Sequence, residues 1–340
     1  MNAAMMEFRE APAAVLRQAE TLAAPLRQLV SRLRQAPPKL LMTCARGSSA
    51  NAAVFCKYLV ERHLGIPVGA IAPSIATIYR RQLRLDQTLF LALSQSGRSD
   101  DLVESALMAK AAGAATAAII NDPASPLAAA CDMVLPIEAG REAGIAATKT
   151  FVATLAALLR LTAAWAEDCA LGKAIERLPG RLSLAGELDW SGGLHILADA
   201  TSLVTIGRGP TLAIAREAAL KLKEGCDLHA EAFSGAEFLH GPIALVSPRY
   251  PIMIFRPTDM AADGLDALAD DLARKGAAVV RAGGAGENTF LHLPTLPVDH
   301  PDTDALCLIQ SFYGFLIELA DRRGTDLVTP RHLQKVTRTR

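Results

Sequence analysis

The feature that most constrains this sequence is a short apolar run that ends in a small polar turn and continues as a helix-like segment. The first instance is KLLMTCA at residues 39–45, followed by Arg46, Gly47, Ser48 and Ser49 and then by a helical pattern. Comparable apolar runs recur at residues 67–72, 88–94, 115–121 and 133–137. Buried runs that alternate with helices are typical of a parallel sheet covered on both faces. The first half of the chain is therefore predicted to form a doubly wound α/β domain.

The second half of the chain repeats this pattern. SLVTIGRGP at residues 202–210 compares with LLMTCARGS at residues 40–48, and the two Arg-Gly pairs align at an offset of 162 positions (Gly47 to Gly209). Apolar runs follow at residues 250–256, 277–283 and 288–294, and helices are predicted from Thr211, over 260–274 and over 304–323. Self-similarity of this kind indicates an internal duplication, so we expect two domains of one architecture in tandem.

Interruptions of the pattern predict the domain limits. Residues 8–35 carry a helical pattern that Pro37 and Pro38 end, and residues 167–200 are less regular, with breaks at Pro179-Gly180 and around Gly192-Gly193. The last residues are polar and irregular, which is typical of a tail. The expected organisation is a helical segment (1–36), a first domain (37–168), bridging helices (169–198), a second domain (199–325) and a C-terminal tail (326–340).

Charge and cysteine content argue against several classes of function. With 35 basic and 35 acidic residues the chain has no net field to attract nucleic acid or an anionic membrane. The six cysteines form no CxxC pair, which favours reduced thiols in a cytoplasmic protein over a disulfide framework or a zinc site. The most apolar region, residues 143–165, contains Lys149 and Arg160, so we expect a buried helix and not a membrane span. The N-terminus has early acidic residues and no long apolar core, which argues against a secretory signal.

The SQSG segment is the first candidate binding site. Ser94, Gln95, Ser96 and Gly97, followed by Ser99, stand where an apolar run passes into a helix. Ligands of open α/β sheets collect at the carboxyl ends of the strands, and a helix N-terminus there favours an anion. Serine hydroxyls add donors, although Ser96 or Ser99 could equally serve only as a helix cap. Ser48 and Ser49 are a second hydroxyl pair that we expect on the same rim, and together they predict a phosphate site.

The glycine pattern argues against a nucleotide. Neither G-x-G-x-x-G after a strand nor G-x-x-x-x-G-K-[ST] occurs, and Gly207-Arg208-Gly209 leads into Pro210 without a third glycine. We expect no cofactor.

A charged helix is the second candidate site. In the helix predicted from Thr211, Glu217, Lys221 and Glu224 stand at i, i+4 and i+7 relative to one another, so they share one face. A solvated salt-bridge face is the simple alternative. The helix follows a predicted strand, however, and leads to a cluster of His229, Glu231, Glu237 and His240. A partly buried carboxylate suits proton abstraction beside a carbonyl, and a histidine suits proton transfer near neutral pH. His229 could be a core histidine, and no spacing here matches a metal site.

Five segments in order together resemble the sugar isomerase (SIS) family, in particular the isomerase half of glucosamine-6-phosphate synthase and its deaminase relatives. They are SQSG with its following hydroxyl, AGREAGIAATKTF (139–151), EAALKLKE (217–224), HAEAFSGAEFLHGP (229–242) and PRHLQK (330–335). The resemblance covers nearly the whole chain. It implies two flavodoxin-like domains in tandem, a homodimer, and a hexose or hexosamine 6-phosphate as ligand.

The resemblance also implies roles for individual residues. Glu224 matches the base that moves a proton between C1 and C2, and His240 matches a ring-opening histidine donated by the neighbouring subunit. Lys335 matches a tail lysine that contacts the substrate carbonyl or forms an imine with it. Glu217 and Lys221 match residues that support the site. The implied substrate-binding residues are Ser48, Ser49, Ser94, Gln95, Ser96, Ser99, Ile145, Ala146, Ala147 and Gln334.

Some positions differ from the pattern of the family. Arg98 stands where the family usually has Glu, and Ala147 stands where Ser is common. Leu239 stands where the family has Lys before HGP, and Gln334 stands where it has Ala before the tail lysine. The synthase also carries an N-terminal glutaminase domain with a cysteine after Met, whereas Asn2 follows Met1 here. The resemblance thus leads us to expect a deaminase that converts glucosamine 6-phosphate and water to fructose 6-phosphate and ammonia. A related sugar-phosphate isomerase, a fructosamine-phosphate deglycase and a non-catalytic sugar-phosphate sensor are the alternatives.

Overall fold

The fold is seen in a computed structural model that describes residues 3–284 and 290–335. The chain divides into two compact units that interleave in sequence. The N-terminal unit comprises residues 11–142 and 149–176 together with Gln334 and Lys335. The C-terminal unit comprises residues 3–10, 143–148, 177–284 and 290–333. The domain limits predicted from the sequence stay a prediction.

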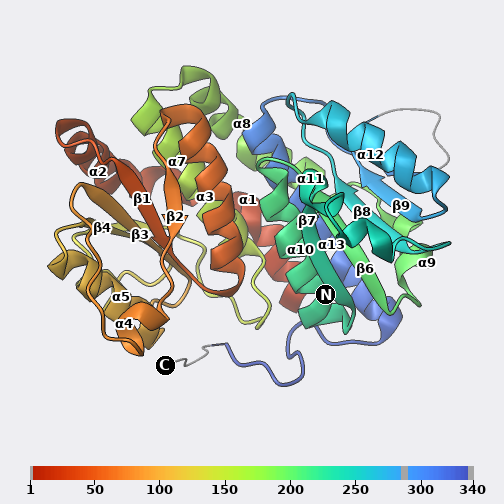
Figure 1. Cartoon of the computed structure of the whole chain (residues 1–340), viewed down its shortest axis with the longest axis horizontal. Helices are drawn as coiled ribbons and strands as arrows, with labels where there is room; N and C mark the ends of the chain where they lie inside the picture. Colours follow the sequence, from red (N-terminus) through yellow and green to blue (C-terminus); the bar gives the residue numbers. More distant parts are fainter. Residues whose placement is uncertain (1–2, 285–289, 336–340) are drawn as a thin grey trace. The chain divides into compact units, whose positions relative to one another are not determined.

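The N-terminal unit is built on a parallel five-stranded sheet in the order β2-β1-β3-β4-β5 (Figure 1). Its strands are β1 (Leu40–Cys44), β2 (Val68–Ala70), β3 (Thr88–Ser94), β4 (Ala115–Ile120) and β5 (Met133–Pro136). Its helices are α2 (Ala23–Gln35), α3 (Gly47–Leu64), α4 (Ser74–Thr77), α5 (Asp100–Ala111), α6 (Pro126–Ala130) and α7 (Lys149–Ala166). All five strands lie at the apolar runs read from the sequence.

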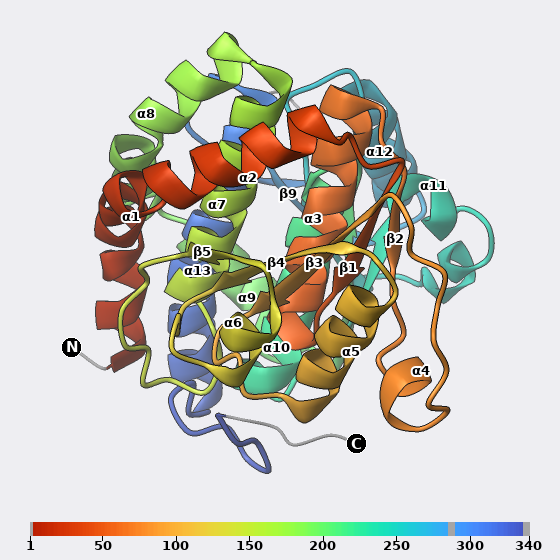
Figure 2. The ribbon, with the colours of Figure 1, turned by 90° about the vertical axis from the view of Figure 1, so that its left-hand side faces the viewer.

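The order of these strands decides which face each helix covers. The chain leaves β1 through α3 to β2 on one side and leaves β3 through α5 to β4 on the other. Because parallel crossovers are right-handed, α3 and α5 lie on opposite faces. Accordingly, α3 packs against α7, while α5 packs against α4 and α6 (Figure 2).

The C-terminal unit repeats this topology with the strand order β10-β9-β8-β6-β7. Its strands are β6 (Ser202–Gly207), β7 (His229–Ser234), β8 (Pro251–Phe255), β9 (Ala278–Ala282) and β10 (Leu291–Leu293). Its helical segments are η1 (Ser191–Gly193), α9 (Leu194–Leu197), α10 (Thr211–Cys226), α11 (Gly235–Phe238), η2 (Pro242–Leu245), α12 (Ala262–Arg274) and α13 (Pro301–Arg323). β6 stands where β1 stands in the first sheet, and β8 where β3 stands. The α/β class and the doubly wound design are confirmed in both units.

Some predicted elements differ from the observed ones. The single helical segment expected over 8–35 is two helices, α1 (Ala3–Thr21) and α2. α8 (Cys169–Ala185) runs through Pro179 and Gly180, where a break was predicted. Its apolar side chains Leu171, Leu178 and Leu182 are fully buried, so tertiary packing outweighs the hydrogen bond that proline removes. β7 was not predicted as a strand. β10 is shorter than the predicted run, of which residues 288 and 289 lie outside the described residues.

Within residues 3–284 and 290–335, two helices are long and apolar enough to cross a membrane, α7 and α13. An 18-residue window of α7 is 83% buried and one of α13 is 89% buried within the fold. Both are therefore core helices here, as predicted for α7.

Candidate functional site

The predicted phosphate residues come together at the carboxyl edge of the N-terminal sheet. β1 and β3 are neighbours, with Cys44 beside Ala92. Ser48 and Ser49 lie in the first turn of α3 after β1. Ser94 is the last residue of β3, and residues 95–99 connect it to α5. β1 and β3 flank the point where the strand order reverses, which is where ligands of this topology bind. Two helix N-termini and several hydroxyls therefore lie at one edge of the sheet.

Local hydrogen bonds shape the SQSG loop. The Ser94 hydroxyl accepts from the Gly97 amide at 3.0 Å, and the Ser96 hydroxyl accepts from the Arg98 amide at 3.3 Å. Ser99 is the N-cap of α5, but its side chain makes no capping hydrogen bond. The capping role that the sequence left open for Ser99 is thus not observed. The Ser94 and Ser96 hydroxyls accept in these bonds and can still donate their own hydrogens, which suits an anion.

Two arginine–aspartate pairs lie beside the SQSG loop and the start of α3. Arg46 contacts Asp101 with Nε and Nη2 at 2.9 Å, and the Asp101 side chain is fully buried in the first turn of α5. Arg98 pairs with Asp122 at 2.8 Å. Asp101 would oppose an anion at that helix end, and Arg46 neutralises its charge. Arg46 and Asp101 were not singled out from the sequence, because the pairing follows only from the adjacency of β1 and β3.

The loop after β5 is held by buried carboxylates. In the N-terminal unit, Glu142 is buried and accepts from the Thr150 hydroxyl at 2.6 Å, and Lys335 Nζ lies 3.6 Å from Glu142 Oε2. Gln334 beside it is exposed. The predicted tail lysine therefore has a buried counter-charge, which the sequence motifs did not reveal.

Residues 143–148 belong to the C-terminal unit and are tied down twice. The Glu7 carboxylate accepts from the Ala143 amide and from the Gly144 amide, the latter at 3.2 Å. The Ile145 amide donates to the Val328 carbonyl at 3.1 Å. Ile145, Ala146 and Ala147 are thereby fixed as a backbone segment, which suits the backbone contact expected of them.

The charged row of α10 is buried, contrary to the solvated alternative. The Lys221 side chain is 1% exposed and that of Glu217 is fully buried. Lys221 Nζ lies 3.5 Å from Glu217 Oε1 and 2.6 Å from Glu224 Oε2. The Glu224 side chain is 21% exposed, so it alone of the three is open to a ligand. Burying charges is costly, and strongly buried ionisable groups cluster at functional sites.

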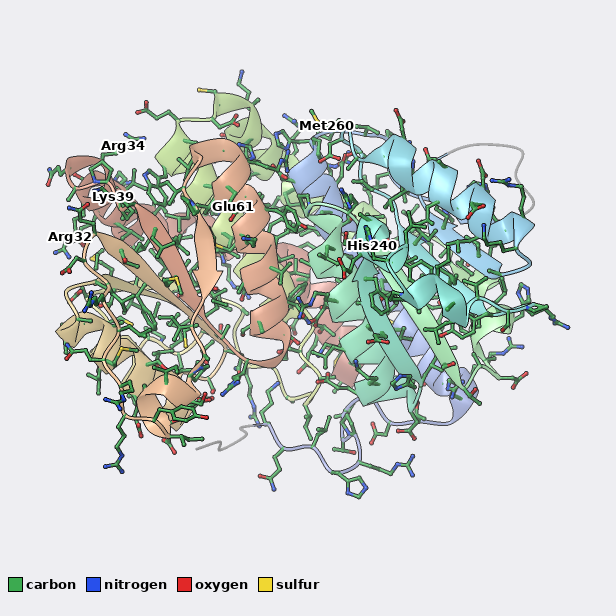
Figure 3. All side chains as sticks on the ribbon, viewed as in Figure 1. Arg32, Arg34, Lys39, Glu61, His240 and Met260 are labelled. Atoms are coloured by element: carbon green, nitrogen blue, oxygen red, sulfur yellow. The ribbon has the colours of Figure 1, made fainter. Side chains whose placement is uncertain are left out.

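His240 is placed differently from the α10 row. It follows α11 in an exposed segment beside Leu239, and within the described residues its side chain has no hydrogen-bond partner (Figure 3). Gly241 has a φ of 148°, a conformation open to glycine alone. His229 is exposed on β7, so the core alternative for it is wrong.

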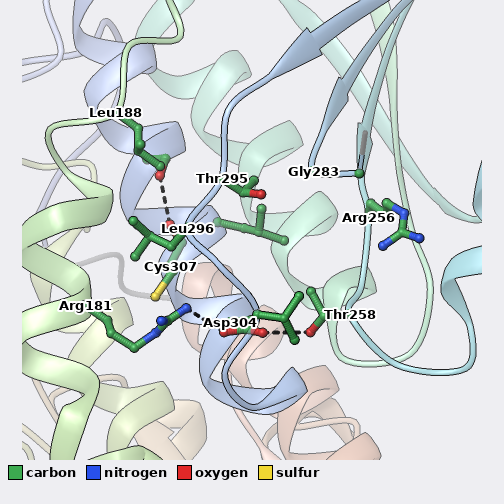
Figure 4. Close-up of a pocket in the computed structure, with 13 residues that line it drawn as sticks. Arg181, Leu188, Arg256, Thr258, Gly283, Thr295, Leu296, Asp304 and Cys307 are labelled. Carbon is green, nitrogen blue, oxygen red and sulfur yellow. Dashed lines mark hydrogen bonds and ion pairs between the residues drawn. The ribbon is translucent and has the colours of Figure 1, made fainter. Parts of the chain in front are cut away.

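A separate pocket lies in the C-terminal unit at the ends of β8 and β9 (Figure 4). It is a cavity of about 120 Å³ and contains none of the predicted site residues. Asp304 receives Arg181 at 2.9 Å and the Thr258 hydroxyl at 2.8 Å, and Arg256 forms a bidentate pair with Asp266. The guanidinium groups of Arg181 and Arg256 are therefore each paired with a carboxylate of the protein, as expected of a structural network.

Comparison with known proteins identifies the family. The model of the SIS domain matches residues 34–164 and 196–281. The chain belongs to the SIS family. The resemblance read from the five sequence motifs is thus confirmed.

Solved SIS structures extend the likeness to the whole fold. A protein from Silicibacter pomeroyi DSS-3 assigned as a phosphosugar isomerase is 41% identical, with a TM-score of 0.91, over 96% of this chain and 99% of its own. The C-terminal domain of glucosamine-fructose-6-phosphate aminotransferase from Francisella tularensis is 26% identical, with a TM-score of 0.87, over 97% of this chain and 98% of its own. This SIS protein is thus related to phosphosugar isomerases.

Among curated proteins, glutamine–fructose-6-phosphate aminotransferase from Zymomonas mobilis is 30% identical over 355 residues. The match covers 97% of this chain and 57% of that protein. The chain therefore spans little more than half the length of this relative.

Proposed function

We propose that this SIS protein is a deaminase that converts glucosamine 6-phosphate and water to fructose 6-phosphate and ammonia. The observation that carries the proposal is the α10 row, in which the partly exposed Glu224 is held by a buried lysine. Such a carboxylate can abstract a proton beside a carbonyl. The likeness to the Francisella aminotransferase domain supports a hexosamine phosphate as the ligand.

The proposed reaction has three steps. His240 protonates and opens the pyranose, giving the aldehyde at C1. Glu224 removes the proton from C2 and returns it to C1, so the 2-amino aldehyde becomes an enolamine and then the C2 imine. Water adds to that imine and ammonia leaves, giving the ketone of fructose 6-phosphate. In this scheme Lys335 contacts the carbonyl end, while Glu217 and Lys221 hold the base.

Binding is proposed to rest on the phosphate. Ser48, Ser49, Ser94, Gln95, Ser96 and Ser99 would surround it, because two helix N-termini and the SQSG turn offer donors there. The backbone of Ile145, Ala146 and Ala147 would line the sugar, with Gln334 near its carbonyl end.

The purified chain should release ammonia and fructose 6-phosphate from glucosamine 6-phosphate alone. Glu224→Gln keeps the size of the side chain and removes the base, so we expect turnover to fall by about 10²–10⁴-fold. Glu231→Gln, an exposed glutamate on β7, is the control and should keep full activity. Ammonia release that is equal in wild type and Glu224→Gln would rule the proposal out.

A sugar-phosphate isomerase that lacks the final hydrolysis is the second candidate, favoured by the likeness to the Silicibacter protein. A panel of keto- and amino-hexose 6-phosphates separates the two. Interconversion of ketose and aldose phosphates without ammonia would identify an isomerase. Release of a free amine or amino acid from a fructosamine phosphate would identify a deglycase, and binding without any turnover a sensor.

We further propose that the protein acts in the cytoplasm as a homodimer in which His240 serves the partner's site. The exposure of Leu239 (52%) and Leu245 (48%) around His240 supports a covered surface there. All six cysteines are unpaired, which fits a reducing compartment. Mixing His240→Ala with Glu224→Gln chains tests the exchange. Statistical hybrid dimers would hold one intact site each and restore about a quarter of wild-type activity, whereas a site within one chain would restore none.

A further inference from the structure

Tyr313 of α13 reaches the charged row of α10 from its buried side. Its ring and hydroxyl are fully buried, and the hydroxyl lies 3.4 Å from Glu217 Oε1. A buried tyrosine hydroxyl requires a partner, and a carboxylate that accepts from it gains a charge-assisted hydrogen bond. α10 and α13 pack along each other, so the contact is part of a continuous helix interface.

The contact completes a row of four polar groups that runs from the core to the surface. Exposure increases from Tyr313 and Glu217 (both 0%) to Lys221 (1%) and Glu224 (21%). One ammonium stands between two carboxylates and lies closer to the exposed one, at 2.6 Å against 3.5 Å. The position of Lys221 therefore depends on how strongly Glu217 attracts it.

Tyr313 weakens that attraction. A hydroxyl that donates to Glu217 satisfies part of its negative charge, so Glu217 competes less for the ammonium. Lys221 is then available to Glu224. Without the hydroxyl, less of the Glu217 charge would be neutralised, and Glu217 would draw Lys221 away from Glu224.

We propose that Tyr313 is a positioning residue, which anchors Glu217 so that Lys221 holds the Glu224 carboxylate in place for proton transfer. The catalytic part of this inference rests on the deaminase function proposed above. The arrangement of the four side chains does not depend on that function, and it can be measured without turnover.

The first measurement is the NMR signal of the Lys221 ammonium nitrogen, assigned by its loss in Lys221→Met. Tyr313→Phe should move this signal, because the hydrogen bonds of the ammonium are redistributed. The control is Ser311→Ala on the same helix. It removes a buried hydroxyl that donates to the Ala185 carbonyl at 2.8 Å and does not touch the row. It should leave the Lys221 signal where it is.

The second measurement is kinetic. With glucosamine 6-phosphate, Tyr313→Phe should lower kcat by about three- to ten-fold and change KM by less than about two-fold, since Tyr313 supports the base and not the binding of the phosphate. Ser311→Ala, corrected for its folded fraction, should change neither constant. Glu217→Gln removes the competing charge, so adding Tyr313→Phe to it should have no further effect.

The outcomes separate the two proposals. A Lys221 signal that does not move in Tyr313→Phe overturns the positioning role, whatever happens to kcat. A signal that moves while kcat stays unchanged overturns its catalytic part. If the signal moves but wild-type protein turns over no sugar phosphate, the deaminase proposal fails and the linked row of side chains stands.

Discussion

The SQSG turn depends on Gly97, which has no side chain. Its φ is +63°, and a Cβ built there would collide with the Ser125 hydroxyl and with Ile120. Ser125 is the N-cap of α6 and accepts from the Ala128 amide. The end of β4 and the start of α6 therefore leave no room for a side chain at this position of the loop. The conformation of Gly97, and not only its size, is required.

Gly97→Ala should weaken the binding of glucosamine 6-phosphate by at least about ten-fold and destabilise the protein by about 1–3 kcal/mol, because strain and collision add. Calorimetric titration in the Glu224→Gln background measures the binding without turnover. Gly65→Ala is the control, since Gly65 also has a positive φ (+66°) but nothing within 4 Å of its Cβ. It should cost stability alone, about 1 kcal/mol. Equal losses of affinity in both variants would contradict the prediction.

The roles of side chains could be predicted from the sequence where they depend only on neighbouring residues of the chain. The SQSG turn and the spacing of Glu217, Lys221 and Glu224 are visible in a few consecutive residues. Glu142, Tyr313 and Asp101 were missed because their role depends on partners far along the chain. Tyr313 lies 96 positions from Glu217, and no short pattern carries that information.

The loop at residues 143–148 owes its position to two distant segments. Glu7 of α1 accepts its amides, and Val328 beyond α13 receives the Ile145 amide. Glu7 is 7% exposed, and a Cβ on Gly144 would lie 2.9 Å from its Oε2. A carboxylate that accepts backbone amides in this way acts as the anchor of the loop.

Glu7→Gln replaces this anchor by a neutral amide of the same shape. We expect a loss of about 1.5–3 kcal/mol in the free energy of unfolding and faster hydrogen exchange at residues 143–148. Urea denaturation and exchange mass spectrometry measure the two effects. Glu20→Gln on the same helix, at an exposed position, should change neither. Unchanged exchange in Glu7→Gln would show that the loop is held by other contacts.

Helices and strands were predicted correctly where the apolar periodicity of the sequence is strong. The predictions failed where the burial of a segment in the fold determines its structure. β3 and the start of α10 lie where they were predicted. β7 was overlooked because an edge strand with exposed His229 and Glu231 shows little apolar character. α8 continues through Pro179 because its apolar face is buried on both sides of that residue.

The closed cores of the two units make five of the six cysteines inaccessible. Burial raises the pKa of Cys44 to about 11 and that of Cys56, Cys131, Cys226 and Cys307 to about 12. Cys169 is exposed at the start of α8. The thiolate is the reactive form of cysteine. Burial therefore lowers reactivity in two ways, because it keeps reagents away from the thiol and because it lowers the fraction of thiolate.

A disulfide reagent at pH 8 should therefore titrate one thiol rapidly in the native protein and six after unfolding. Cys169→Ser should remove the rapid phase entirely. Absorbance of the released chromophore follows both phases. A second rapid thiol in the native protein would mean that one of the cores opens more readily than the structure shows.

The duplicated sheet order was foreseeable from the aligned Arg-Gly pairs, but the interleaving of the units was not. Residues 3–10 belong to the C-terminal unit, and Gln334 and Lys335 belong to the N-terminal unit. These assignments rest on contacts such as Gln310 Nε2 donating to the Phe8 carbonyl at 3.1 Å. A local sequence pattern does not show to which of the two units a terminal segment belongs.

The pairing of Phe8 with Gln310 has a consequence for synthesis on the ribosome. The two residues are 302 positions apart, so at roughly 5–20 residues per second about 15–60 s pass between their emergence. During that interval the first turns of α1 carry an apolar face without its partner. The first turns of α1, although synthesised long before α13, reach their native contacts only after α13 has emerged, and in that interval we expect them to be bound by nascent-chain chaperones.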